Sequence, residues 1–305
     1  VRWDGETDPP HDPGLASGWV MEGGYGDDGR HNESTIVFKP IMVRDHAREY
    51  LWDKGGQFVL MSATIISPEQ MAYDLGLEDG EWAVVEIESN FPKERRPVVV
   101  RAETAVTHKT KSTAHPILTR QVAEIADAYP DYRILVHSNS YHLTKDLFFD
   151  GRRIAREGRE RYITYLNAGE RAKAIEKYME KENGVLIAPS LDRGVDFHDD
   201  LARVIVIAKV PYLSLGDKQV SARLYGTGKN GKVWYAVNTI RTIVQQTGRG
   251  MRHKDDWSIC YILDRQFVKL YYENRRLFPN WWKEAVVFDE NDPRWRDVLK
   301  ELGSS

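Results

Sequence analysis

The 305-residue sequence has a single cysteine, Cys260, which lies in the apolar run SICYILD. One thiol cannot form an intrachain disulfide, a cysteine zinc site or an iron–sulfur cluster. We therefore predict that Cys260 is a buried core thiol in a reducing compartment, and that this chain holds no iron–sulfur cluster.

Long apolar runs and an excess of basic residues are also missing. No run approaches the ~18 apolar residues of a membrane-spanning helix, and the N-terminus, VRWDGETDPP, is too acidic and polar for a signal peptide. We expect a cytoplasmic protein with no membrane partner. The net charge is −3, so any contact with nucleic acid must be local. The histidines show no metal-ligand spacing, His108 and His115 being an example, and we predict no metal site.

Hydrophobic residues make up 41% of the sequence, enough for a packed core in one or two domains. Residues 1–35 are rich in Gly, Pro and Asp and predict an irregular lead-in. A regular pattern follows, with a Pro-rich, charged link near residues 90–97 that we interpret as a domain boundary. We divide the rest of the chain into three parts. Residues 36–92 would be the end of a first domain, residues 93–270 a second domain, and residues 271–305 a C-terminal extension.

Strands and helices alternate along most of the chain. Continuous apolar runs such as YRILVHS, GVLIAPS, ARVIVIAKV and SICYILD are separated by helical patterns. This pattern predicts an α/β fold with a parallel sheet and crossover helices. We also predict a strand over QFVLMSAT and a helix that starts at Ser67. Ligands of such sheets bind at the carboxyl ends of the strands, here after Thr64, Ser138 and Ser190.

The segment QQTGRGMR concentrates glutamine, glycine and arginine. If Val233 to Arg252 form one helix, Gln245, Arg249 and Arg252 fall on one stripe, apart from an apolar stripe. Gly248 would let the helix approach a neighbour closely. Guanidinium groups bind phosphate with paired hydrogen bonds, so this ridge is suited to an anionic, oxygen-rich ligand.

Four motifs in order resemble those of superfamily-two helicases. QQTGRGMR matches the Q-x-x-G-R-x-x-R pattern of their sixth motif, and LMSATIIS, ILVHSNSY and IAPSLDRGVDF resemble the third, fourth and fifth. Three further segments resemble one group within this superfamily: FKPI before the Ser-Ala-Thr segment, DLGL after it, and ILDRQF after the sixth motif. Over approximately residues 36–270 the chain resembles the xeroderma-pigmentosum-D/DinG group of DNA helicases, which implies RecA-like domains.

The resemblance implies roles for matched positions. The sixth-motif arginines of the family reach the γ-phosphate of ATP across a cleft between two RecA-like domains. The catalytic positions are then Arg249, Arg252 and Gln245. The nucleotide-binding positions are Gly194, Asp196 and Gly248.

The resemblance also implies contacts with single-stranded DNA. Ser140 and Tyr141 match the family's fourth motif, near the DNA backbone, and Asn139 and Ser190 are further candidates by position. Ser62 and Thr64 match the third motif, which couples hydrolysis to strand movement. Arg193 departs from the group, which usually has Glu before the fifth-motif glycine, and its role stays open.

A helicase also needs a phosphate-binding loop and carboxylates for Mg²⁺, which precede Ser-Ala-Thr in this family. The 61 residues before Ser62 contain neither. We therefore expect an ATP-dependent helicase motor represented by its C-terminal half, inactive alone. Its partners would be single-stranded DNA and a missing N-terminal RecA-like half, with ATP and Mg²⁺ as cofactors.

Two alternatives remain open from the sequence. The chain could be a nucleic-acid-binding module that never hydrolyses ATP. It could instead be a self-contained P-loop phosphotransferase that uses Lys232 of GTGKNGKV and Asp289 of AVVFDEND, although Val233 replaces the magnesium-binding Ser or Thr. We favour a mobile surface loop for the glycine–lysine stretch.

Two clusters have structural explanations as well as functional ones. Trp281 and Trp282 could stack bases or dock a C-terminal tail on the core. An arginine-rich run could follow DNA phosphates, although we favour a solvated helix face. Its members are Arg152, Arg153, Arg156, Arg159 and Arg161.

Overall fold

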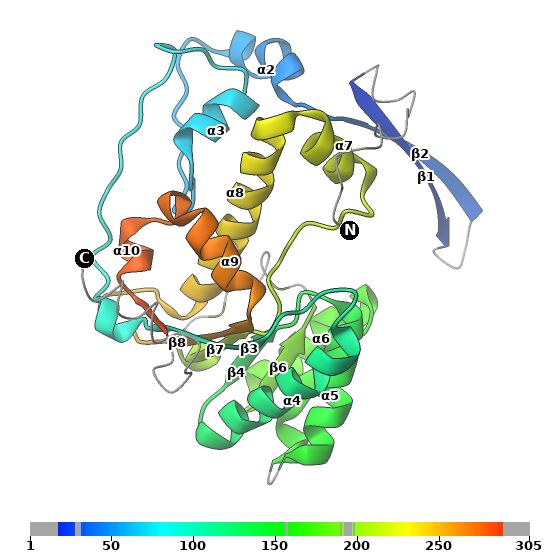
Figure 1. Ribbon diagram of the computed structural model, residues 1–305, viewed down its shortest axis with the longest axis vertical. Coiled ribbons are helices and arrows are strands. Elements are labelled where there is room, and N and C mark those ends of the chain that lie inside the picture. Colours follow the sequence, from blue (N-terminus) through cyan, green and yellow to red (C-terminus); the bar gives the residue numbers. More distant parts are fainter. Residues whose placement is uncertain are drawn as a thin grey trace. The chain divides into compact units, whose positions relative to one another are not determined.

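The computed structural model describes residues 18–27, 32–155, 158–189, 191, 197 and 199–288. The chain divides into two units (Figure 1). Unit 1 comprises residues 1–86 and 212–239, and unit 2 comprises residues 87–211 and 240–305.

Unit 2 is built on a seven-stranded sheet in the order β5-β6-β4-β7-β8-β3-β9, and every neighbouring pair is parallel. This arrangement confirms the predicted α/β class with a RecA-like parallel sheet. The strands are β3 (Val98–Thr104), β4 (Ile134–His137), β5 (Tyr162–Thr164), β6 (Val185–Ala188), β7 (Val204–Ile207), β8 (Ile259–Asp264) and β9 (Val286–Phe288).

Helices cover both faces of this sheet. Helices α4 and α5 lie on one face, and α9 and α10 on the other (Figure 1). The helices of unit 2 are α4 (Lys111–Ala128), α5 (Tyr141–Ile154), α6 (Arg171–Glu180), the last part of α8 (Gly228–Thr247), α9 (Gln266–Glu273) and α10 (Asn280–Lys283). Short 3₁₀ turns are η2 (Lys93–Arg95), η3 (Arg159–Arg161), η4 (Ala168–Glu170), η5 (Asp199–Ala202), η6 (Gly248–Gly250) and η7 (Arg275–Leu277).

The core of unit 2 is built from strand residues two positions apart, because alternate side chains of a strand lie on the same face of the sheet. Ile134 and Val136 of β4 join the buried cluster that holds Val122 of α4 and Leu143 of α5. All four side chains are at most 1% exposed. Each contributes roughly 2 kcal/mol through burial, and together they fix α4 and α5 on one face of the sheet.

The C-terminal region is part of this sheet rather than an appendage. The predicted boundary at residue 270 falls inside α9, and β9 pairs with β3 at the edge of the sheet. Trp282 is 1% exposed, and its Nε1 donates to Thr247 Oγ1 at 2.8 Å. Of the two interpretations of Trp282, the structure supports the one in which this residue docks the C-terminal region on the core.

Unit 1 begins with an antiparallel hairpin of β1 (Trp19–Asp27) and β2 (Asn32–Pro40). The prediction of an irregular lead-in over residues 1–35 is wrong for these strands. The glycines of β1 hide this strand, because a ladder is built by backbone hydrogen bonds that glycine also makes. The hairpin is tied to α7 (Lys218–Gly226), where Gln219 Nε2 donates to Pro40 O at 2.6 Å.

The other elements of unit 1 are helical. They are α2 (Arg44–Tyr50), η1 (Trp52–Lys54), α3 (Pro68–Asp74) and the first part of α8 (Gly228–Thr247). The helix predicted at Ser67 is confirmed, since the Ser67 side chain accepts from Gln70 N at 3.2 Å. Gly76, with φ of 67°, follows directly after the C-cap residue Leu75 and supplies the left-handed turn that ends this helix.

The predicted strand over residues 57–64 is wrong. The structure describes all of these residues and assigns them no strand, and Val59 and Met61 are 84% and 88% exposed. A strand needs a neighbour to complete its ladder, and no described strand pairs with this segment. None of the helices within the described ranges has the length and apolar character that crossing a bilayer requires.

Candidate nucleotide and nucleic-acid site

Asp264, the last residue of β8, joins three strand ends at the carboxyl edge of the unit 2 sheet. Its Oδ1 accepts from the backbone N–H groups of Val106 and Gln266, and its Oδ2 from that of Val210, each at 3.0 Å. Burial raises the pKa of the Asp264 carboxyl, although these three donors act in the opposite direction. The carboxyl therefore organises the loops that follow β3, β7 and β8.

Asn139, in the fourth motif, connects two further segments at this edge. Its Nδ2 donates to Lys209 O at 2.7 Å, and its Oδ1 accepts from Gln246 Nε2 at 3.0 Å. Gln246, in the sixth motif, is fully buried, and its Oε1 has no hydrogen-bond partner among the residues that the structure describes. Two of the motifs found in the sequence therefore meet at the end of β4, as the parallel-sheet prediction requires.

The two residues after Asn139 start α5. Ser140 caps this helix, since its Oγ accepts from Leu143 N at 3.5 Å. Tyr141 is 50% exposed. Of the predicted DNA contacts in the fourth motif, Tyr141 presents the most open side chain. Ser140 and Asn139 already have structural roles, and contact with DNA stays a prediction for all three.

The sixth-motif arginines do not lie on a continuing helix. Helix α8 ends at Thr247 and the 3₁₀ turn η6 follows, so the prediction of one helix through Arg252 is wrong. Glycine costs about 1 kcal/mol in a helix relative to alanine, and Gly248 and Gly250 fall two residues apart. The side chains of Gln245, half-buried Arg249 and exposed Arg252 therefore do not form the helical stripe that the sequence predicts.

The predicted close approach at Gly248 is also wrong. A Cβ added there would meet no atom of the described residues within 4 Å, whereas one added at Gly250 would overlap Ala202 O and the side chain of Ser258. Gly250 is therefore the glycine that packing requires. The open space at Gly248 is compatible with a ligand beside it.

Asp256 shapes the segment that carries Arg252, and the sequence analysis missed it. Its Oδ2 accepts from the backbone N–H groups of Arg252 and His253 at 2.8 and 3.1 Å. Its Oδ1 pairs with Arg203 Nη1 at 3.1 Å. Although burial alone would raise the pKa of Asp256, these donors and the Arg203 charge lower it. An Asp four residues after a motif arginine is the one sequence signal for this turn.

Other predicted site residues are placed elsewhere or not described. Ser62 and Thr64 lie in unit 1, where Ser62 Oγ accepts from Thr64 N at 3.1 Å. The predicted coupling role stays a prediction. The fifth-motif positions that lie outside the described residues are Ser190, Arg193, Gly194 and Asp196.

The glycine–lysine stretch is a helical corner rather than a mobile loop. Helix α7 ends at Gly226, and α8 begins at Gly228, which has φ of 57°. Gly231 lies against the backbone carbonyls of Arg223 and Leu224, where a Cβ would overlap both. Because a helix precedes the stretch instead of a strand, the self-contained P-loop alternative is not supported. Its second member, Asp289, lies outside the described residues.

Part of the arginine-rich run is structural. Arg161 is 6% exposed and donates to four backbone carbonyls: those of Ala126 and Tyr129 at 2.9 Å, that of Asn183 at 2.7 Å and that of Tyr132 at 3.2 Å. Arg153 is exposed and pairs with Asp150 at 3.3 Å. Arg156 lies outside the described residues.

Residues 122–285, more than half of the chain, match the family model described as "Helicase C-terminal domain". The chain belongs to this helicase family. The resemblance to the xeroderma-pigmentosum-D/DinG group is thereby confirmed, and the helicase C-terminal domain occupies most of unit 2.

Named relatives agree with this assignment. The chain is 25% identical over 260 residues to a "Probable ATP-dependent helicase" of Methanocaldococcus jannaschii, and the match covers 77% of this chain and 38% of the relative. It is 22% identical over 244 residues to the ATP-dependent DNA helicase YoaA of Escherichia coli, covering 77% and 37%. The helicase chain thus spans less than half the length of these relatives.

Solved structures show the same fold. Xpd4 of S. tokodaii superposes with a TM-score of 0.58 at 17% identity, covering 85% of this helicase chain and 49% of that chain. A structure titled "XPD_APO" gives 0.56 at 17% identity, covering 82% and 52%. At these identities the likeness concerns the fold alone.

Proposed function

We propose that this chain is the C-terminal half of an ATP-dependent DNA helicase motor. Unit 2 would be its second RecA-like domain, and single-stranded DNA its nucleic-acid partner. The observation that carries the proposal is the hydrogen bond between Gln246 and Asn139, which joins the sixth and fourth motifs at the carboxyl edge of the sheet. Ligands of parallel α/β sheets bind at this edge.

The residues around the sixth motif fit a nucleotide phosphate. Arg249 and Arg252 are permanently charged, and the position of Gly248 is open. Together with Gln245, the two arginines would hold the γ-phosphate of ATP. The phosphate loop and the Mg²⁺ carboxylates would come from an N-terminal RecA-like domain. ATP supplies the phosphoanhydride whose cleavage drives the motor.

The proposal assigns DNA contacts to the neighbouring fourth motif. Tyr141 is exposed at the start of α5 and offers an aromatic ring on which a base can stack. Ser140 N–H and the other backbone donors near this helix start suit a phosphate. Binding of this kind tolerates any sequence and weakens as salt rises.

The first test is ATP hydrolysis by the 305-residue chain, with and without single-stranded DNA at low salt. We expect DNA binding without turnover. Robust DNA-stimulated turnover by the chain alone would overturn the split ATP site. We expect turnover to appear when an N-terminal RecA-like domain with a phosphate loop is fused before this chain.

Substitutions in that fusion test the arginines. Arg249→Ala should lower kcat by about 10³-fold, because such arginines stabilise the charge that develops on the transferred phosphoryl group. Arg276→Ala, an exposed arginine of η7, is the control and should leave kcat unchanged. Equal activity of Arg249→Ala and the parent would favour the alternative of a module that only binds nucleic acid.

A further inference from the structure

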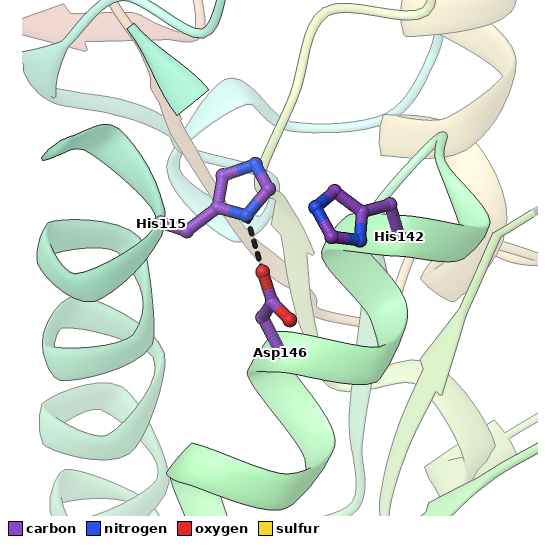
Figure 2. Close-up of side chains that lie close together, drawn as sticks. All are labelled: His115, His142 and Asp146. Atoms are coloured by element: carbon purple, nitrogen blue, oxygen red, sulfur yellow. Dashed lines mark hydrogen bonds and ion pairs between the residues drawn. The ribbon is translucent and has the colours of Figure 1, made fainter. Parts of the chain in front are cut away.

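Helices α4 and α5 bring two histidines and one aspartate together. His115 comes from α4, and His142 and Asp146 from α5; Figure 2 shows the three side chains converging between the two helices. The spacing of the histidines along the sequence predicts no metal site, because His115 lies on a different helix from His142 and Asp146 and only packing brings the three together. Among the described residues this is the group of His, Cys, Asp and Glu side chains close enough to hold one metal ion.

The geometry of the cluster is compact. His115 Nδ1 and Asp146 Oδ2 are 2.5 Å apart, and the centroids of the two imidazole rings are 5.4 Å apart. One candidate ligand atom from each residue lies within 4.8 Å of the other two. Ligands of a tetrahedral zinc ion are roughly 3.4 Å apart, as follows from bonds of about 2.0–2.1 Å. Adopting this separation requires the exposed His142 side chain to rotate toward the other two. It also requires His115 Nδ1 and Asp146 Oδ2 to move roughly 1 Å apart as bonds to the ion replace their hydrogen bond.

Local structure holds two of the three ligands in register. His142 and Asp146 are at positions i and i+4 of α5, so both project from one side of the helix. The Ser140 cap fixes the start of this helix immediately before His142. His115 is held from the opposite side, since its backbone carbonyl accepts from Thr119 Oγ1 at 2.9 Å within α4.

The cluster is only partly buried, so an ion and water can reach it. His115 is 8% exposed, the Asp146 side chain is 31% exposed, and His142 is exposed. The two helices also begin after β3 and β4, so these ligands lie within their first two turns, near the carboxyl edge of the sheet. The hydrogen bond between His115 and Asp146 alone would explain two of the residues but not the convergence of His142.

We propose that His115, His142 and Asp146 bind one divalent transition-metal ion of the zinc class, with water in the remaining position. Two imidazoles and a carboxylate suit Zn²⁺, Co²⁺ or Ni²⁺, whereas Mg²⁺ and Ca²⁺ prefer sites made of oxygen ligands. The ion would link α4 to α5 through ligands from both helices. The inference does not depend on the proposed motor function, since it concerns binding by unit 2 alone.

Metal titration of the untagged 305-residue chain tests the site. Zn²⁺ binding is measured by calorimetry, and Co²⁺ binding by its visible absorption. We expect one equivalent per chain and a rise in Tm with Zn²⁺, because the ion binds the folded state. Mg²⁺ should produce neither effect. Absence of saturable Zn²⁺ or Co²⁺ binding would overturn the proposal.

Matched variants locate the ion. His142→Ala removes an exposed ligand whose side chain makes no hydrogen bond to any residue in the described ranges, and it should weaken Zn²⁺ binding at least tenfold without loss of folding. His108→Ala, an exposed histidine before α4, should bind Zn²⁺ like the parent. Asp146→Asn should weaken binding and Asp150→Asn, one turn further along α5, should not. Equal affinity in His142→Ala and the parent would place the ion elsewhere and overturn the assignment.

Discussion

Gln246 donates its side-chain amide to Asn139 Oδ1 across 3.0 Å, although the two residues lie 107 positions apart in the sequence. Asn139 has φ of 50°, in the left-handed region where most L-residues lose about 1–2 kcal/mol. Asparagine tolerates this region, and its Nδ2 also donates to Lys209 O. The turn between β4 and α5 is therefore held by side-chain bonds from two other segments.

Paired substitutions at Asn139 separate these effects. Asn139→Gly removes the side-chain hydrogen bonds but relieves the backbone, whereas Asn139→Ala removes the same bonds and keeps the strain. We expect both variants to be less stable than the parent, with Ala about 1 kcal/mol below Gly. Urea unfolding with an unchanged m-value measures the difference. An Ala variant as stable as the Gly variant would contradict the proposed strain.

The two sixth-motif glycines should respond differently to alanine. Gly250→Ala places a methyl group against Ala202 O and Ser258, and we expect a loss of about 2 kcal/mol in the free energy of unfolding. Gly248→Ala adds a methyl group in open space and should change stability by less than about 0.5 kcal/mol. Thermal unfolding of both variants gives the comparison. Similar losses in the two would show that η6 is packed differently.

The sheet of unit 2 could be predicted because its central strands are continuous apolar runs. β4 and β7 consist of Ile, Val and Leu apart from His137, and each is buried along its full length. Such strands need both faces covered, which requires helices between them. The hairpin of β1 and β2 could not be predicted in this way, because its glycines carry no hydrophobic alternation.

The candidate site likewise has some features that the sequence predicts and others that depend on tertiary packing. The charge of Arg249 and Arg252 can be read from the sequence, but the end of α8 at Thr247 depends on how Gly250 packs against Ala202. The metal cluster depends on packing too, since His115 and Asp146 are 31 positions apart on different helices. Only the pairing of His142 with Asp146 at i and i+4 is visible in the sequence alone.

Arg161 and Arg153 test which arginines of the run support the fold. Arg161→Ala leaves several buried carbonyls without donors and should cost about 3 kcal/mol of stability. Arg153→Ala breaks a surface ion pair with Asp150 and should cost less than about 1 kcal/mol. Guanidinium chloride unfolding distinguishes the two. A small loss for Arg161→Ala would mean that water replaces its hydrogen bonds.

Asp256 should make stability depend on acid pH. Its pKa in the folded protein lies below the ordinary value of 3.8, because the Arg252 and His253 N–H groups and Arg203 outweigh the effect of burial. The ionised carboxylate therefore stabilises the fold above pH 3.8. This contribution is lost as the pH falls from 3.8 through the lowered pKa, since the unfolded chain takes up the proton first.

Asp256→Asn isolates that contribution. The amide keeps the shape of the side chain but loses the charge, so we expect a loss of about 2 kcal/mol at pH 7. The difference between parent and variant should persist at pH 5 and shrink below about pH 4, where the parent carboxylate begins to lose its advantage. Urea unfolding at a series of pH values measures it. A difference that stays constant down to pH 3 would show that the carboxylate charge is not what holds the Arg252 segment, and the hydrogen-bonded turn alone would then position this arginine.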